Sequence, residues 1–193
     1  MLKIENDIYI GLLHYPIHNR KGEIITTTVT NLDLHDITRV GKTYDVKKYF
    51  VINHLKSQKA LIKRMMNYWT DGYGAEFNKN RKQAYSIMEI ADNLQEVIKK
   101  ITCISGRKPK IVATDAKVFP NSISYKGMRK KMLDSKTPYL ILFGTGWGLT
   151  ENTLELCDYI LAPIYGRGEF NHLSVRSAAS IILDRLLATE WWK

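Results

Sequence analysis

The sequence contains little cysteine and no metal-binding pattern. Its two cysteines, Cys103 and Cys157, form no C-x-x-C pair, which argues against a disulfide framework and against a cysteine-rich zinc site. His14 and His18 flank Pro16, which prevents helical i,i+4 spacing of the two imidazoles, so no metal site is predicted. A reduced, cytoplasmic protein is therefore expected.

Long apolar runs are absent as well. No run approaches the roughly 20 apolar residues that a membrane-spanning helix needs. The first residues, MLKIENDIYIGLL, carry acidic side chains before the apolar run and no small-residue cleavage site, so they are not expected to be a signal peptide. Neither a repeat of fixed period nor a low-complexity segment is present. We expect no association with membranes.

The common nucleotide-binding fingerprints are also missing. The loop FGTGWGLT is not a Gly-x-Gly-x-x-Gly sequence that opens a helix, and no lysine follows it as in a P-loop. A nicotinamide or ATP enzyme on a doubly wound fold is therefore poorly supported. On its own, the loop is also compatible with a tight turn packed by Trp147.

Apolar residues and an uneven charge distribution are what the sequence does have. Its 193 residues, 45% of them hydrophobic, suit a single α/β domain over residues 1–193. The net charge of +10 lies in the middle, where residues 56–136 hold 18 Lys or Arg against 7 Asp or Glu. A basic region of this kind attracts RNA or DNA phosphates, although a solvated set of helices would look the same.

Short apolar strands alternate with helical patterns along the chain. Strands are expected at Asp7–Pro16, Lys48–Asn53, Lys110–Thr114 and within YLILF and DYILA; helices are expected at residues 33–39, 54–70, 82–101, 124–133 and 173–192. Residues 71–82 look like a polar loop. This order predicts a parallel sheet covered by helices on both faces. Ligands of such folds bind at the carboxyl ends of strands, which directs attention to Asn31–Arg39, Thr114–Ser124, Gly144–Thr150 and Ala162–Ser174.

Two segments carry a family resemblance. The stretch LILFGTGWGLTENTLELCDYILAPIYGRGEFNHLSVRSAASIILDRLL resembles the C-terminal half of SPOUT-class RNA methyltransferases, and NLDLHDITRVGKTYDVKKYFVI resembles their first motif. The resemblance implies a parallel-sheet SPOUT fold with a C-terminal trefoil knot, a homodimer, and S-adenosylmethionine bound in the knot by backbone groups.

The same resemblance supplies site residues. Leu142, Phe143, Ile164 and Leu173 would surround the adenine, and the glycines would expose the main chain or let knotted loops pass closely. The residues implied to bind the cofactor are Leu142, Phe143, Gly144, Thr145, Gly146, Gly148, Ala162, Pro163, Ile164, Gly168, His172, Leu173 and Ser174.

Three residues are implied in catalysis: Arg39, Asn171 and Ser174. Arg39 matches the first-motif arginine, and Ser174 stands where ribose methylases have asparagine, followed by Arg176 in place of a serine. Each has a structural alternative. Asn171 and Ser174 suit helix capping at the start of the last helix, and Arg39 suits an ion pair with Asp36. His172 could serve as a base or simply pack in its loop.

The leading interpretation is transfer of a methyl group from S-adenosylmethionine to tRNA or rRNA. A ribose 2′-oxygen is the first acceptor considered and a guanine ring nitrogen the second. The basic middle would bind the RNA, and Tyr73 is a candidate for stacking on bases. A non-catalytic module that binds S-adenosylmethionine and RNA is the alternative. Trp191 and Trp192 are expected to pack at a core or dimer edge.

Overall fold

A seven-stranded parallel sheet forms the centre of the protein. The computed structural model describes residues 4–189, and Trp191 and Trp192 lie outside this range. The strands follow the order β5 (Met88–Ala91), β4 (Lys48–Ile52), β1 (Ile8–Leu13), β8 (Tyr139–Gly144), β6 (Lys110–Thr114), β9 (Tyr159–Leu161) and β7 (Ser122–Ile123). Every pair in this sheet is parallel. The predicted α/β class is confirmed.

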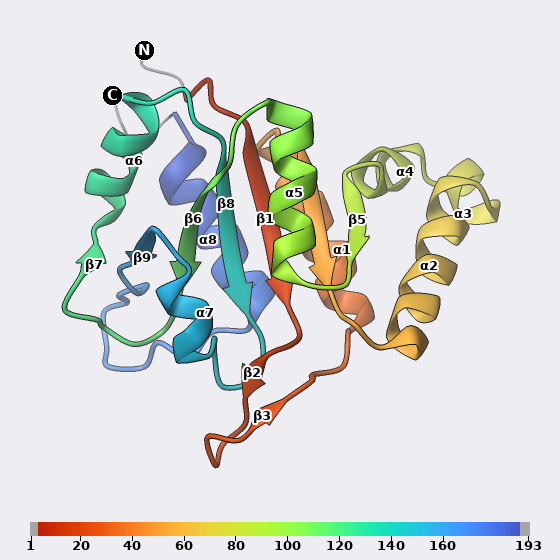
Figure 1. The fold of residues 1–193 in the computed structure, drawn as a ribbon. Coiled ribbons are helices and arrows are strands. Elements are labelled where there is room, and N and C mark those ends of the chain that lie inside the picture. Colours follow the sequence, from red (N-terminus) through yellow and green to blue (C-terminus); the bar gives the residue numbers. More distant parts are fainter. Residues whose placement is uncertain (1–3, 190–193) are drawn as a thin grey trace.

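Helices cover both faces of the sheet (Figure 1). One face packs against α1 (Asn31–Thr43), α6 (Tyr125–Leu133) and α8 (Val175–Leu187), and the other against α5 (Leu94–Ser105) and α7 (Glu151–Glu155). Alternate residues of each strand enter the two cores because successive side chains point to opposite faces. In β8, Ile141 and Phe143 belong to the α1–α8 core, while Leu140 and Leu142 belong to the α5 core.

The helix α1 is longer than predicted. It begins at the N-cap Thr30, whose side chain accepts a hydrogen bond from the backbone N–H of Asp33, and it continues through Gly41 to Thr43. Gly41 does not end the helix. A Cβ there would lie 3.0 Å from Ile87 Cδ1 and 3.3 Å from Ile10 Cδ1, so the glycine lets α1 approach the sheet closely.

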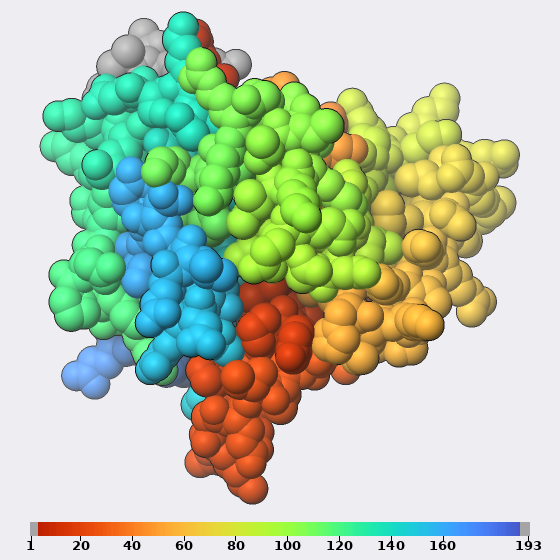
Figure 2. All heavy atoms as spheres, in the orientation of Figure 1, coloured from red at the N-terminus to blue at the C-terminus, as the bar shows by residue number. Residues whose placement is uncertain are grey.

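A short hairpin extends from the carboxyl end of the sheet. Its strands, β2 (Ile17–His18) and β3 (Ile24–Ile25), form a separate two-stranded sheet. The hairpin projects below the body of the molecule in Figures 1 and 2. Ile17 also bridges to Leu149, so the hairpin lies against the loop that follows β8.

Three helices between β4 and β5 form an arm at the edge of the sheet. They are α2 (Lys56–Thr70), α3 (Tyr73–Phe77) and α4 (Lys79–Tyr85). We call residues 56–85 the helical arm; it protrudes beyond β5 in Figure 1 and forms the projection on the same side in Figure 2. Residues 71–82 are therefore largely helical, and their prediction as a polar loop is wrong.

The predicted helix over residues 82–101 is also wrong. The stretch contains the end of α4, the strand β5 and the start of α5. The helix α5 begins anew because Asn93 Oδ1 accepts a hydrogen bond from the backbone N–H of Glu96 at 2.9 Å, which is a typical N-cap. The short elements α7 and β7 were not predicted.

Within residues 4–189, no helix combines the length and apolar character required to cross a membrane.

Candidate functional site

The main cavity lies at the carboxyl ends of the central strands. It has a volume of about 700 Å³, within the usual range of small-molecule sites. Its lining comes from four segments, namely the run before α1 and the loops after β6, β8 and β9: Thr27, Thr28, Thr30, Asp33, Thr114–Lys117, Phe143–Gly148, Ala162–Ile164 and Asn171–Arg176, with Tyr125, Ala178 and Ile182 behind them. The predicted loops after β6, β8 and β9 do converge, whereas α1 contributes Asp33 alone.

Close packing explains the glycines of the loop after β8. Gly146 and Gly148 have φ of +58° and +103°, a region that favours glycine. A Cβ on Gly146 would lie 3.0 Å from Ile17 Cγ2 and 3.1 Å from the carbonyl oxygen of His18. The backbone N–H of Trp147 donates to that same oxygen at 3.0 Å. The hairpin therefore sets the path of this loop. The Trp147 side chain is 60% exposed and does not pack the turn.

Hydrogen bonds between threonine hydroxyl groups hold the loop after β8 in place. Thr145 Oγ1 donates to the carbonyl oxygen of Leu13 at 3.0 Å and lies 2.5 Å from Thr27 Oγ1. The Thr27 hydroxyl also lies 3.0 Å from His14 Nδ1 and 3.5 Å from the carbonyl oxygen of His14. His14 Nε2 is buried without a hydrogen-bond partner, and burial lowers the pKa of His14 to about 4. His14 is thus a neutral structural support at neutral pH.

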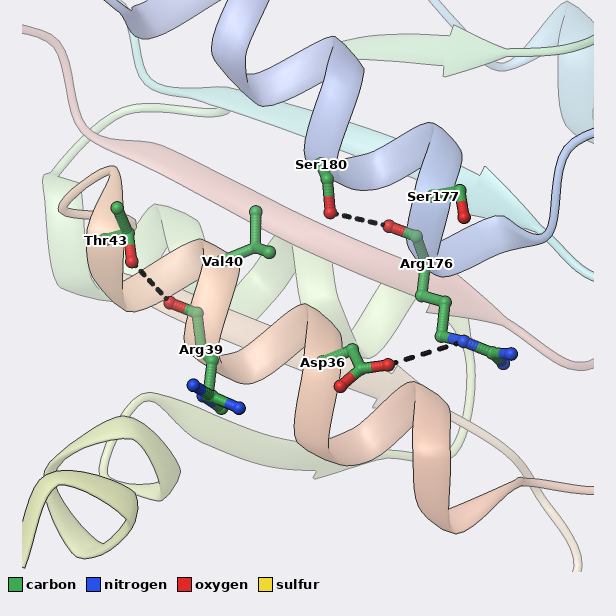
Figure 3. A pocket seen from close by; sticks show the side chains of 7 residues that line it. All are labelled: Asp36, Arg39, Val40, Thr43, Arg176, Ser177 and Ser180. Atoms are coloured by element: carbon green, nitrogen blue, oxygen red, sulfur yellow. Dashed lines mark hydrogen bonds and ion pairs between the residues drawn. The ribbon is translucent and has the colours of Figure 1, made fainter.

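Arg176 joins the cavity to a second groove. It stands in the first turn of α8, where the helix dipole disfavours a cation. Two carboxylates of α1 compensate: Arg176 Nη1 lies 3.3 Å from Asp33 Oδ1, and its Nε lies 3.4 Å from Asp36 Oδ2. The groove of about 350 Å³ between α1 and α8 is lined by Asp36, Arg39, Val40, Thr43, Arg176, Ser177 and Ser180. Figure 3 shows Asp36 reaching Arg176 while Arg39 points away from it.

Asn171 and Ser174 line the cavity and also hold its backbone. Asn171 Nδ2 donates to the carbonyl oxygen of Ala116 at 2.7 Å, which ties the loop after β9 to the loop after β6. Ser174 is the N-cap of α8 and accepts from the backbone N–H of Ser177 at 3.3 Å. The N-cap alternative for Ser174 is therefore confirmed.

Three predicted site residues lie outside the cavity. Leu142 is fully buried in the α5 core, because alternation along β8 turns it away from its neighbour Phe143. Gly168 is exposed, with no atom within 4 Å of an added Cβ. Arg39 lies in the groove between α1 and α8 and not in the cavity. Asp36, its expected ion-pair partner, binds Arg176 instead.

The other predicted cofactor residues do line the cavity: Phe143, Gly144, Thr145, Gly146, Gly148, Ala162, Pro163, Ile164, His172, Leu173 and Ser174. Sequence reasoning missed the threonines at positions 27, 28 and 30. Asp33, Asp115 and Lys117 lie in segments expected to border the site but were not named as site residues. The run TTTVT directly before a helix was the available signal, since it places hydroxyl groups at a strand-end loop. Among residues 4–189, no group of three or more His, Cys, Asp or Glu is placed to hold a metal ion.

The fold and the cavity define a class: a parallel α/β protein with a small-molecule pocket formed by its last strand-end loops. A family model described as SAM-dependent RNA methyltransferase matches residues 7–188. The chain therefore belongs to this family of RNA methyltransferases, whose cofactor is S-adenosylmethionine.

Individual proteins and a solved structure are also similar to this chain. The chain is 41% identical over 187 residues to an uncharacterized protein of Aquifex aeolicus, covering 97% of this chain and 91% of that one. It is 37% identical to a protein of Oleidesulfovibrio alaskensis named tRNA (guanine-N(1)-)-methyltransferase, covering 94% of this chain but only 42% of the relative. The fold matches the SpoU methyltransferase AviRb from Streptomyces viridochromogenes, solved with AdoMet, at a TM-score of 0.56 and 16% identity, over 94% of this chain and 57% of that one.

The residues around the cavity suit S-adenosylmethionine. Phe143, Ile164 and Leu173 offer apolar walls for an adenine ring. The carboxylates of Asp33 and Asp115 are acceptors for ribose hydroxyls or for the cationic end of the cofactor. A Cβ on Gly148 would lie 3.1 Å from Asp115 Oδ2, so the glycine keeps the surroundings of this carboxylate open.

Proposed function

We propose that this protein transfers a methyl group from S-adenosylmethionine to a nucleotide of tRNA or rRNA, with a ribose 2′-oxygen favoured as acceptor. The observation that carries the proposal is the cavity of about 700 Å³, walled by Phe143, Ile164 and Leu173 and bordered by charged Asp33 and Arg176, in a chain of this family. A guanine ring nitrogen is the second acceptor, supported by the name of relatives of which the chain spans 42%.

The residues at the cavity have separate tasks in this proposal. Bound S-adenosylmethionine supplies a methyl group on a sulfonium, which an in-line nucleophile can accept. Arg176 binds an RNA phosphate beside the acceptor, because its guanidinium borders the cavity and is held by Asp33 and Asp36. Asn171 keeps two loops of the wall together through its bond to Ala116. Ser174 fixes the start of α8.

We also propose that the C-terminal crossing is a trefoil knot. The backbone N–H of Ala162 donates to the carbonyl oxygen of Ile123 on β7 at 2.8 Å, and Asn171 Nδ2 donates to the carbonyl oxygen of Ala116 in the loop between β6 and β7. The chain therefore leaves β9 against this loop and then returns to pack α8 on α1. Threading of α8 through the loop between β6 and β7 would explain why the segment between β9 and α8 contacts both β7 and that loop.

A homodimer would give Arg39 a role that the single chain does not provide. Arg39 is exposed, with no ion-pair partner within residues 4–189. We propose that the α1–α8 groove faces a second copy, so that Arg39 approaches the cavity of that copy. Sedimentation of wild type and Arg39→Ala tests the assembly. A wild-type monomer would contradict it.

Labelled methyl transfer tests the proposed activity. Purified protein is incubated with methyl-labelled S-adenosylmethionine and with separate tRNA and rRNA fractions, and the product is digested to nucleosides. A 2′-O-methylated nucleoside supports the favoured acceptor, and a base-methylated guanosine supports the second. Cofactor binding without transfer to either RNA would favour the non-catalytic module. No cofactor binding at millimolar concentration would contradict the proposal.

A further inference from the structure

The helical arm is firmly anchored to the body of the protein. Trp69 lies with its ring centroid 5.3 Å from that of His35 on α1 and 6.3 Å from that of Tyr85. The guanidinium of Arg81 lies 4.3 Å above the same indole, a favourable cation–π contact. Four aromatic or cationic groups thus connect α1, α2 and α4. The arm therefore packs against the body of the protein through specific side-chain contacts.

The helix α3 packs closely against the end of α2. A Cβ on Gly74 would lie 2.6 Å from Tyr68 Cε1 and 2.7 Å from Trp69 Cε3, so only glycine permits this contact. The two aromatic residues of α3 consequently face solvent. Tyr73 is 69% exposed and Phe77 is 76% exposed. Their rings are stacked, with centroids 6.2 Å apart and an interplanar angle of 22°. Two adjacent exposed rings offer flat apolar faces on which a planar ligand can stack.

The helical arm that carries this aromatic pair is rich in positive charge. Residues 56–85 contain seven Lys or Arg and two Asp or Glu. Within residues 4–189, Lys59 is the one cation of the arm with an ion pair, to Asp92 at 2.5 Å. The remaining exposed cations are Lys56, Lys63, Arg64, Lys79 and Lys82. Aromatic faces with flanking cations suit single-stranded RNA, because bases stack on the rings while phosphates meet the cations. Duplex RNA keeps its bases stacked on one another and offers none to the rings.

The arm is continuous with the wall of the cavity. Gln58, in the first turn of α2, accepts a hydrogen bond through Oε1 from the backbone N–H of Val29 at 2.9 Å. Val29 lies within the threonine run whose members Thr27, Thr28 and Thr30 line the cavity. The first turn of α2 therefore lies against the segment that borders the cavity, whereas Tyr73 and Phe77 follow the last turn of that helix.

We propose that the helical arm binds an unpaired segment of the substrate RNA, with Tyr73 and Phe77 stacking on its bases. This inference rests on the proposed function for the identity of the RNA as substrate. The part of the basic segment that contacts RNA would then be the helical arm, and its ligand would be unpaired rather than duplex RNA.

Binding of a labelled, unstructured 20-nucleotide RNA tests the inference. Tyr73→Ala/Phe77→Ala is expected to weaken binding about tenfold or more, since stacking contributes roughly 1–3 kcal/mol per base. The salt dependence should stay unchanged. Lys79→Glu/Lys82→Glu is expected to reduce the slope of log Kd against log salt by about 1.4, at roughly 0.7 per lost phosphate contact. A duplex RNA of equal length should respond to the lysine variant and not to the aromatic variant.

The matched control is Ile104→Ala/Leu156→Ala, which removes two apolar side chains, each 54% exposed, away from the arm. It should bind the RNA as wild type does. Unchanged RNA affinity in both arm variants would overturn the inference. So would a change of sedimenting mass in Tyr73→Ala/Phe77→Ala, which would identify the aromatic pair as a contact between copies of the chain.

Titration with S-adenosylmethionine separates this inference from the proposed function. Arm variants that lose RNA binding and keep wild-type cofactor affinity support the arm as a docking surface. If wild type binds the RNA through the arm but binds no cofactor, the proposed function fails and the docking surface stands.

Discussion

Gly146→Ala should damage both the stability of the protein and its affinity for S-adenosylmethionine. Gly146 has φ of +58°, and a left-handed backbone costs an L-residue roughly 1–2 kcal/mol. The new methyl group would also lie 3.0 Å from Ile17 Cγ2 and 3.1 Å from the carbonyl oxygen of His18. If the loop keeps its path, the free energy of unfolding should fall by about 2 kcal/mol or more.

The loop can instead relieve this strain by moving away from the hairpin. The unfolding free energy then falls less, but the wall of the cavity is displaced and cofactor binding must restore it. The affinity would fall by up to the same amount, and about 2 kcal/mol corresponds to roughly 30-fold in Kd. The substitution must therefore lower the unfolding free energy, weaken cofactor binding, or do both.

Calorimetric titration with S-adenosylmethionine and urea unfolding measure both quantities. Gly168→Ala is the control, because Gly168 is exposed and an added Cβ there meets no atom within 4 Å. It should leave Kd and stability as in wild type. A Gly146→Ala protein with wild-type Kd and wild-type stability would refute the reasoning. Equal loss of affinity in both variants would show that Gly168 also contacts the cofactor.

Three further predictions concern charge and burial. Arg176→Gln should lower the rate of methyl transfer tenfold or more, the order expected from losing one charge-assisted contact. The Kd for the cofactor should stay within about threefold of wild type. An unchanged rate of transfer would contradict the role given to Arg176. Because burial holds the pKa of His14 at about 4, below its usual 6.5, the unfolded chain binds the proton first as pH falls. Stability should therefore drop by about 2 kcal/mol between pH 7.5 and pH 5, and His14→Gln should lose this part of the pH dependence in urea unfolding. Burial raises the pKa of Cys157 to about 12, so iodoacetamide at pH 7.5 should modify exposed Cys103 and leave Cys157 unreacted by mass spectrometry.

The strands and helices that could be predicted are those with a clear hydrophobic periodicity in their own sequence. The strand Tyr139–Gly144 and the helix Val175–Leu187 have clear periods of 2 and 3.6 residues, and both were located from sequence. The strand Met88–Ala91 was missed because four residues at a sheet edge carry too short a pattern. Because helix-forming residues lie on both sides, one helix was predicted across the strand. The N-cap residue Asn93 was a signal that a new helix begins there.

The site was predictable where its residues are consecutive. The loops after β8 and β9 form a local motif, and most of their residues line the cavity. Contacts between distant segments could not be read in this way. The ion pair of Asp33 with Arg176 spans 143 positions, and no local pattern connects the two. Leu142 was misplaced because a motif match does not distinguish the two faces of a strand.

The cavity wall draws on nearly the whole length of the chain, from Thr27 to Ile182. During synthesis on the ribosome, the first wall residues emerge long before the last helix does. The nascent chain therefore cannot hold the cofactor until translation has passed α8 and that helix has packed on α1. S-adenosylmethionine then stabilises only finished molecules, by an amount that grows with the logarithm of its concentration once this exceeds Kd. Cellular cofactor supply would thus influence how much of the newly made protein survives.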